Sequence, residues 1–104
     1  MTTRPKTTEA GAFLQRLAGP LTLGSLLEAI RLGEGWSQQE MGRRLRLSRA
    51  HLCDIEKGRR SVSPERAARF ARVLGYSEPQ FVQLALQGMV DHAGLRLRVA
   101  VKAA

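Results

Sequence analysis

Positive charge is concentrated in one short stretch of this sequence. Residues 43–60 include seven Arg or Lys against two acidic residues, and the 104-residue chain carries a formal net charge of +8. Such side chains neutralise phosphate oxygens, so the excess fits a polyanionic partner such as nucleic acid. A basic surface is equally compatible with a membrane face or with solubility alone, so charge by itself leaves these alternatives open.

Two short helices with a tight turn between them are predicted across this stretch. Ser37 can cap a helix over residues 38–45, with Glu40 completing a capping box, and Ser48 can cap a second helix. Two helices joined in this way form a helix-turn-helix, which presents the start of its second helix to base edges in the major groove. The residues at that start are Arg49, Ala50 and His51.

Apolar residues at spacings of three and four predict three further helices around this pair. They follow the capping residues Thr22, Ser63 and Ser77 and end near the glycines at 33–35, 75 and 88. The predicted fold is all-α, with a helix-turn-helix domain of five helices over residues 21–88. Residues 1–20 are predicted to be an N-terminal tail with one or two helical turns over residues 12–18.

Residues 23–75 resemble the phage repressor and Cro class of helix-turn-helix domains, also called the xenobiotic-response-element family of bacterial regulators. The matching segments are Ser37-Gln38-Gln39-Glu40, Leu45-x-Leu47-Ser48-Arg49, Ile55-Glu56-x-Gly58 and Leu74-Gly75. The resemblance covers about half of the chain. It implies a compact lambda-repressor-like bundle whose second and third helices form the DNA-binding unit, the third being the recognition helix.

The resemblance also implies which positions contact bases. Arg49, Ala50 and His51 correspond to the base-facing positions, and Asp54 lies one turn further along. Arg49 suits guanine O6 and N7, Ala50 leaves room for a thymine methyl group, and His51 can donate to a base or a phosphate.

A second set of positions is expected at the DNA backbone. Gln38 corresponds to a family residue that touches a phosphate and braces the recognition helix. Residues after that helix resemble phosphate contacts. The predicted DNA-binding residues are Gln38, Arg46, Ser48, Arg49, Ala50, His51, Asp54, Lys57, Arg59 and Arg60. Glu56 is expected to pair with an arginine such as Arg44, because its charge would repel phosphate.

Arg46 departs from the family pattern. The family usually has Gly between the two helices, where the backbone is left-handed, and a non-Gly residue there costs on the order of 1 kcal/mol. Either a phosphate contact by Arg46 compensates for this cost, or the turn has a different shape.

A strand is predicted near the C-terminus, where residues 95–102 alternate strictly between apolar and other side chains. A single strand leaves both edges unpaired and needs a partner. We therefore expect residues 89–104 to serve dimerisation, with the strand pairing antiparallel to its copy in a second chain. The apolar face of this strand consists of Leu95, Leu97, Val99 and Val101. The alternative is a tail that stays flexible until another protein accepts it by strand addition.

Several other classes of protein are not expected. The single cysteine excludes an intramolecular disulfide and any multi-cysteine zinc site, and the two histidines lack clustered ligands, so no metal or cofactor is expected. No nucleophile with its base, paired carboxylates or phosphate-binding glycine loop is recognisable, so we do not expect an enzyme. No apolar run approaches the roughly 20 residues that span a membrane, and the N-terminus does not resemble a signal peptide, which predicts a cytoplasmic protein.

The sequence thus predicts a DNA-binding transcriptional regulator, a repressor acting as a homodimer on a palindromic operator. Two half-sites one helical turn apart double the number of base contacts that one domain offers. An alternative role is the antitoxin of a toxin–antitoxin pair, which represses its own promoter and binds a toxin. A third hypothesis is a protein-interaction adaptor without DNA binding, although the basic stretch argues against it.

Overall fold

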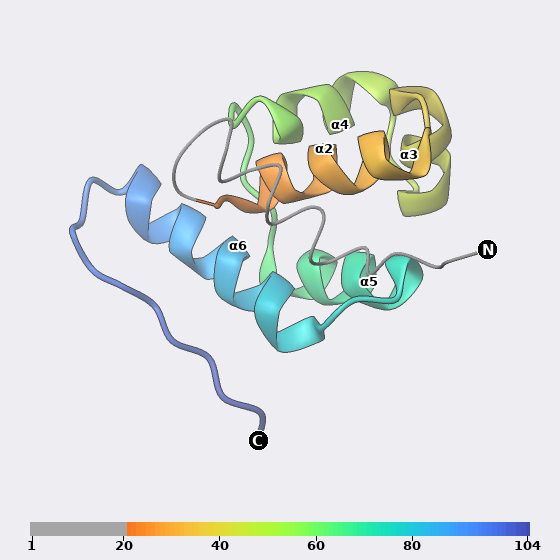
Figure 1. The fold of residues 1–104 in the computed structure, drawn as a ribbon. Helices are drawn as coiled ribbons and strands as arrows, with labels where there is room; N and C mark the ends of the chain where they lie inside the picture. The colour runs from red at the N-terminus through yellow and green to blue at the C-terminus, as the bar shows by residue number, and fades with distance from the viewer. Residues whose placement is uncertain (1–20) are drawn as a thin grey trace.

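The computed structural model describes residues 21–104, and all regular secondary structure in that range is α-helical. Its helices are α2 (Leu23–Glu34), α3 (Gln38–Leu45), α4 (Arg49–Glu56), α5 (Pro64–Leu74) and α6 (Glu78–His92). Helices α2, α3 and α4 form one group, and α5 and α6 pack against each other beside it (Figure 1). The five-helix prediction is confirmed, whereas the helix predicted over residues 12–18 lies outside the described residues.

The predicted capping residues begin all five helices. In each case the side-chain oxygen accepts a hydrogen bond from the backbone N–H three residues later, which satisfies one donor of the open first turn. These residues are Thr22, Ser37, Ser48, Ser63 and Ser77. The five helix starts are therefore fixed by local sequence.

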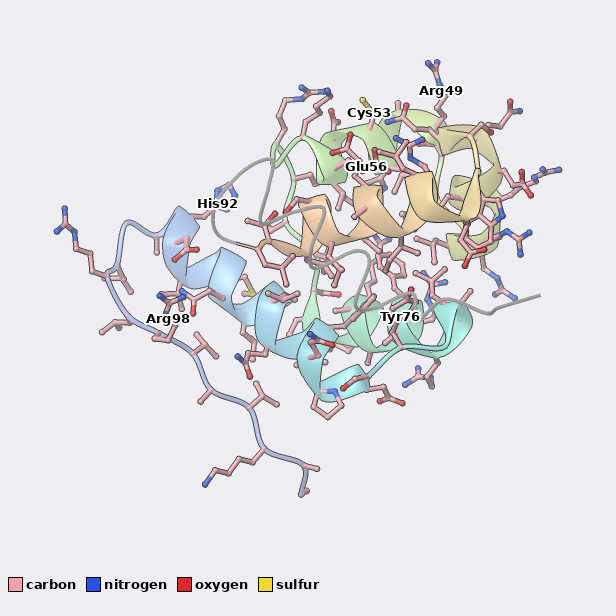
Figure 2. All side chains as sticks on the ribbon, viewed as in Figure 1. Arg49, Cys53, Glu56, Tyr76, His92 and Arg98 are labelled. Atoms are coloured by element: carbon pink, nitrogen blue, oxygen red, sulfur yellow. The ribbon has the colours of Figure 1, made fainter. Side chains whose placement is uncertain are left out.

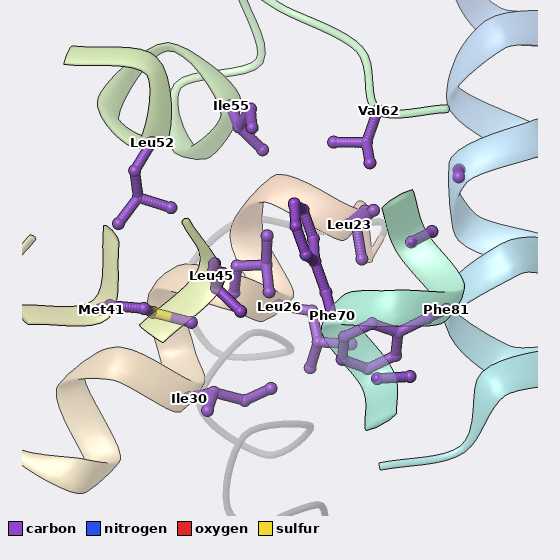
Figure 3. Close-up of a cluster of buried hydrophobic side chains, with 14 of the residues drawn as sticks. Leu23, Leu26, Ile30, Met41, Leu45, Leu52, Ile55, Val62, Phe70 and Phe81 are labelled. Carbon is purple, nitrogen blue, oxygen red and sulfur yellow. The ribbon is translucent and has the colours of Figure 1, made fainter. Parts of the chain in front are cut away.

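One apolar core joins the two groups of helices (Figure 3). Phe70 of α5 and Phe81 of α6 are fully buried together with residues of α2, α3 and α4. The buried residues outside α5 and α6 include Leu27, Met41, Leu45 and Leu52. Helices α5 and α6 thus serve as the support on which the helix-turn-helix rests.

Helix α6 is longer than the sequence predicted. It passes through Gly88 and ends at His92, and the left-handed conformation that follows a helix end falls on Gly94, with φ of 76°. A glycine inside a helix costs conformational entropy but does not by itself end the helix. No helix in residues 21–104 is long and apolar enough to cross a membrane.

The predicted strand is wrong for this chain, because residues 95–104, here called the C-terminal tail, contain no β-structure. The tail runs back alongside α6 (Figure 1). Leu95 and Leu97 are 52% and 62% exposed, whereas Val99 and Val101 are half-buried. The physical reason is that a strand requires a second strand, and none exists in the described residues to pair with it.

Gly24 allows α2 and α4 to approach more closely than any residue with a side chain would. A Cβ atom at this position would lie 2.0 Å from the Ile55 carbonyl oxygen of α4. In the same helix, Gly33 has nothing within 4 Å of the corresponding position. The packing of α2 on α4 therefore requires glycine at position 24 but not at position 33.

We predict that Gly24→Ala lowers the free energy of unfolding by about 1–3 kcal/mol, because the added methyl group forces the two backbones apart. Gly33→Ala is the matched control and should raise it by about 0.5–1 kcal/mol, since alanine is the better helix former. Urea denaturation followed by circular dichroism measures both changes. A Gly24→Ala protein as stable as the parent would contradict the close packing of α2 on α4.

Candidate nucleic-acid interface

The first turn of α4 is capped, and its first two residues are exposed. Ser48 accepts a hydrogen bond from the His51 N–H at 3.0 Å, while Arg49 and Ala50 are exposed and His51 is half-exposed. The Arg49 side chain extends outward from the start of this helix (Figure 2). The turn can therefore approach base edges in a groove, as the helix-turn-helix geometry requires.

The turn between α3 and α4 keeps the left-handed conformation without a glycine. Arg46 has φ of 60° and is the only non-glycine residue with positive φ among residues 21–104. Its N–H donates to the Arg43 carbonyl at 3.2 Å, and the following Leu47 N–H donates to the Gly42 carbonyl at 2.7 Å. The left-handed turn therefore forms without a glycine, and the Arg46 side chain remains exposed beside the start of α4.

Close contact at Gly42 explains how the chain turns so tightly. A Cβ atom there would lie 2.7 Å from the Leu47 carbonyl oxygen, so any larger residue would push the turn away from α3. Leu47 itself is buried, 9% exposed, and anchors the middle of the turn in the core. Backbone contact and one apolar side chain thus contribute to the relative position of α3 and α4.

Glu56, at the C-terminal end of α4, joins α2, α3 and α4 in one polar network. Arg31 of α2 donates to both of its carboxylate oxygens, with Nε–Oε2 of 2.8 Å and Nη2–Oε1 of 3.1 Å. Gln38 of α3 donates from Nε2 to Oε1 at 3.1 Å. Arg31 also donates to the Trp36 carbonyl at 3.2 Å. A carboxylate held in this way fixes the orientation of α4 relative to the other two helices.

The network is almost entirely shielded from water. The side chains of Arg31 and Glu56 are 12% and 1% exposed. The hydrogen bond to Glu56 raises the pKa of Arg31, so the guanidinium stays charged at any physiological pH. A buried ion pair with satisfied hydrogen bonds is tolerated, but loss of either partner would leave an uncompensated charge.

The prediction that Glu56 pairs with Arg44 is wrong, because its partner is Arg31. Arg44 instead forms an ion pair with Glu40 one turn away at 3.2 Å, and its guanidinium lies 4.1 Å from the centre of the Trp36 ring. The sequence indicated only that Glu56 needs a positively charged partner. It did not identify the cation, because Arg31 is 25 residues away.

Asp54 and Arg59, both predicted to contact DNA, contact each other. Arg59 Nε donates to Asp54 Oδ1 at 3.0 Å, and Arg59 Nη2 lies 3.8 Å from Cys53 Sγ. The pair bridges α4 and the segment after it and reduces the charge that either residue presents. Lys57 and Arg60, the other predicted phosphate contacts in that segment, are exposed.

His51 has its pKa lowered below the ordinary value of 6.5. Partial burial is the largest cause, the positive charges of Arg60 and Arg66 add to it, and Asp54 opposes it. The lowered pKa therefore favours the neutral imidazole in the free protein, and this form can both donate and accept a hydrogen bond. This state suits contact with a base edge better than a purely ionic contact with phosphate.

The comparison with protein families agrees with this geometry. Residues 22–84 match the model of a family described as a helix-turn-helix domain. The match covers more than half of the chain, which therefore belongs to this family. No curated protein and no solved structure matches the chain. A helix-turn-helix domain indicates a DNA-binding regulator.

We predict that Arg46→Gly raises the free energy of unfolding by up to about 1 kcal/mol, because glycine adopts the left-handed conformation without a Cβ clash. Arg43→Gly is the matched control: it removes the same charge from an exposed helical position of α3 and should lower stability by about 1 kcal/mol. Thermal unfolding measures both. Equal destabilisation by the two substitutions would show that Arg46 is not strained.

Proposed function

We propose that the protein is a sequence-specific transcriptional repressor that inserts α4 into the major groove of its operator. The observation that carries this proposal is the combination of an exposed, capped first turn with a buried network at the other end of the same helix. Arg49 then contacts guanine, Ala50 faces a thymine methyl group and the neutral His51 contacts a base. Asp54 is a weaker candidate, because Arg59 already occupies its carboxylate.

Contacts with the phosphates surround this turn. The exposed cations include Arg46 before α4 and Lys57 and Arg60 after it, while Arg59, also exposed, is paired with Asp54. The N-terminus of α3 adds unpaired backbone N–H groups near Gln38, where an anion is favoured. Phosphate contacts of this kind supply affinity without sequence preference and make binding decrease steeply with salt.

We propose that two chains bind one palindromic operator in the cytoplasm. One recognition helix offers few base contacts, and two half-sites about 34 Å apart double them. We do not assign this dimer to the C-terminal tail. Antiparallel self-pairing would place Arg96, Arg98 and Lys102 of both chains on one face, and like charges opposite each other destabilise a sheet.

A second candidate role is the antitoxin of a toxin–antitoxin pair, which adds a protein partner to the same DNA-binding activity. The observation that favours it is the C-terminal tail, which lies outside the matched domain and exposes Leu95 and Leu97. Co-expression with the product of the adjacent gene tests this role. Growth arrest by that product alone, relieved by this protein, would support the antitoxin role, and absence of any toxicity would eliminate it.

The proposal of base recognition is tested by two substitutions that each remove one charge. The operator is first selected from random DNA with the purified protein. Arg49→Ala should then cost about 1–3 kcal/mol of operator affinity and relax preference at one base pair. Arg60→Ala should weaken operator and random DNA equally and reduce the salt slope by about one unit.

Arg72→Ala is the control for these two variants. Arg72 is an exposed residue of α5 whose side chain pairs with Glu78 at 3.2 Å, so this substitution also removes one positive charge. It should leave operator affinity and base preference unchanged. Equal loss by Arg49→Ala on operator and random DNA would refute base recognition and assign Arg49 to the phosphates. Failure of the parent protein to select any sequence would overturn the proposed function and favour the adaptor hypothesis.

A further inference from the structure

Gln87 of α6 binds the backbone of the C-terminal tail at two points. Its side-chain oxygen accepts from the Val99 N–H at 2.7 Å, and its side-chain nitrogen donates to the Leu97 carbonyl at 2.8 Å. A backbone amide in a β-ladder offers the same pair of groups, one donor and one acceptor, to a neighbouring strand. The Gln87 side-chain amide therefore pairs with the tail as one residue of a neighbouring strand would.

Glutamines on successive turns of α6 hold the tail extended beyond Gln87. Gln83, one turn earlier, accepts from the Val101 N–H at 3.2 Å. One helical turn of four residues rises about 6 Å, and two residues of extended chain span roughly 6.6 Å, so the two repeats nearly coincide. Asp91 accepts from the Gln87 amide nitrogen at 2.9 Å, which fixes the orientation of that amide.

One edge of the extended tail remains open. Backbone groups of successive residues in an extended chain point to opposite edges. Those of Leu97, Val99 and Val101 face the glutamines of α6, so those of Arg98 and Ala100 face the other way. Within residues 21–104, no hydrogen bond reaches that second edge.

The side chains beside the open edge define what fits there. One face of the tail carries apolar residues, of which Leu95 and Leu97 are more than half exposed. The other face carries the exposed cations Arg96, Arg98 and Lys102. A strand added to the open edge would place its alternate side chains beside these two faces.

We propose that the open edge of the C-terminal tail, held extended by Gln83 and Gln87, binds an extended protein segment in which acidic and apolar residues alternate. The added strand gains backbone hydrogen bonds from the edge, apolar contact on one face and opposite charges on the other. A second copy of this chain fits poorly, because its own alternate residues are basic. This interaction goes beyond the proposed DNA binding and does not depend on it.

DNA is a less suitable occupant of this surface. Arg98 lies far across the molecule from Arg49 (Figure 2). Phosphate would also leave the open backbone edge and the exposed leucines without partners.

The test uses the full chain and an eight-residue synthetic peptide of alternating valine and glutamate. Nuclear magnetic resonance should show the Arg98 and Ala100 amide protons shifting and becoming protected from exchange, while the Val99 and Val101 amides change little. Two control peptides should bind at least about tenfold more weakly. One has the same composition arranged in two blocks, and the other has lysine in place of glutamate. Arg98→Glu should reduce the preference for the glutamate peptide over the lysine peptide, because Arg96 and Lys102 remain positive.

Gln87→Ala examines the part played by α6. It removes both hydrogen bonds between the Gln87 amide and the tail. The tail must then be ordered when the peptide binds, so the dissociation constant of the peptide should rise several-fold. Gln80→Ala is the control on an exposed position of the same helix and should change nothing.

Three results would overturn the proposal. The first is equal binding of the alternating and block peptides, which would mean that charge alone attracts them. The second is a dimer in sedimentation that disappears when residues 95–104 are removed, which would make a second copy the occupant. The third is a fall of about one unit in the salt slope of DNA binding in Arg98→Glu, which would assign the basic face to DNA.

Discussion

The buried carboxylate of Glu56 is the interaction on which the candidate site depends. It is held by the guanidinium of Arg31 and the amide of Gln38, so that one charged group connects α2, α3 and α4. Loss of one partner of a buried pair costs about 3–5 kcal/mol, which is comparable to much of the stability of a small domain. Helix α4 therefore has a fixed orientation, and in the proposed function less free energy is spent on ordering it when it binds DNA.

Backbone contact complements this network. Gly24 brings α2 against the C-terminal part of α4, and Gly42 brings the turn against α3. Side chains of α5 and α6 complete the core beneath them. The exposed residues at the start of α4 are consequently attached to a helix that is held at its far end and at the preceding turn, while the first turn itself stays open.

Local features of the fold were predictable from sequence, because capping residues and apolar spacing act within one helix. The five helix starts are of this kind, whereas the sequence left the shape of the turn at Arg46 open. The partner of Glu56 was not predictable, since Arg31 and Gln38 lie on other helices and meet it only after packing. The predicted C-terminal strand failed for a related reason: alternation at residues 95–101 indicates an extended chain, but pairing depends on what lies beside it. Here Gln83 and Gln87 of α6 lie beside the tail instead of a second strand. Their spacing of four residues was the only feature of the sequence that indicated this arrangement.

The most direct test of this account is a double-mutant cycle on operator affinity with Gln38→Ala, Glu56→Ala and the double variant, each corrected for its folded fraction. If the contact between these two residues positions α4, the effects are non-additive, with a coupling of about 0.5–3 kcal/mol. Additive losses would contradict the account, because they would show that Gln38 and Glu56 act on DNA binding independently of each other.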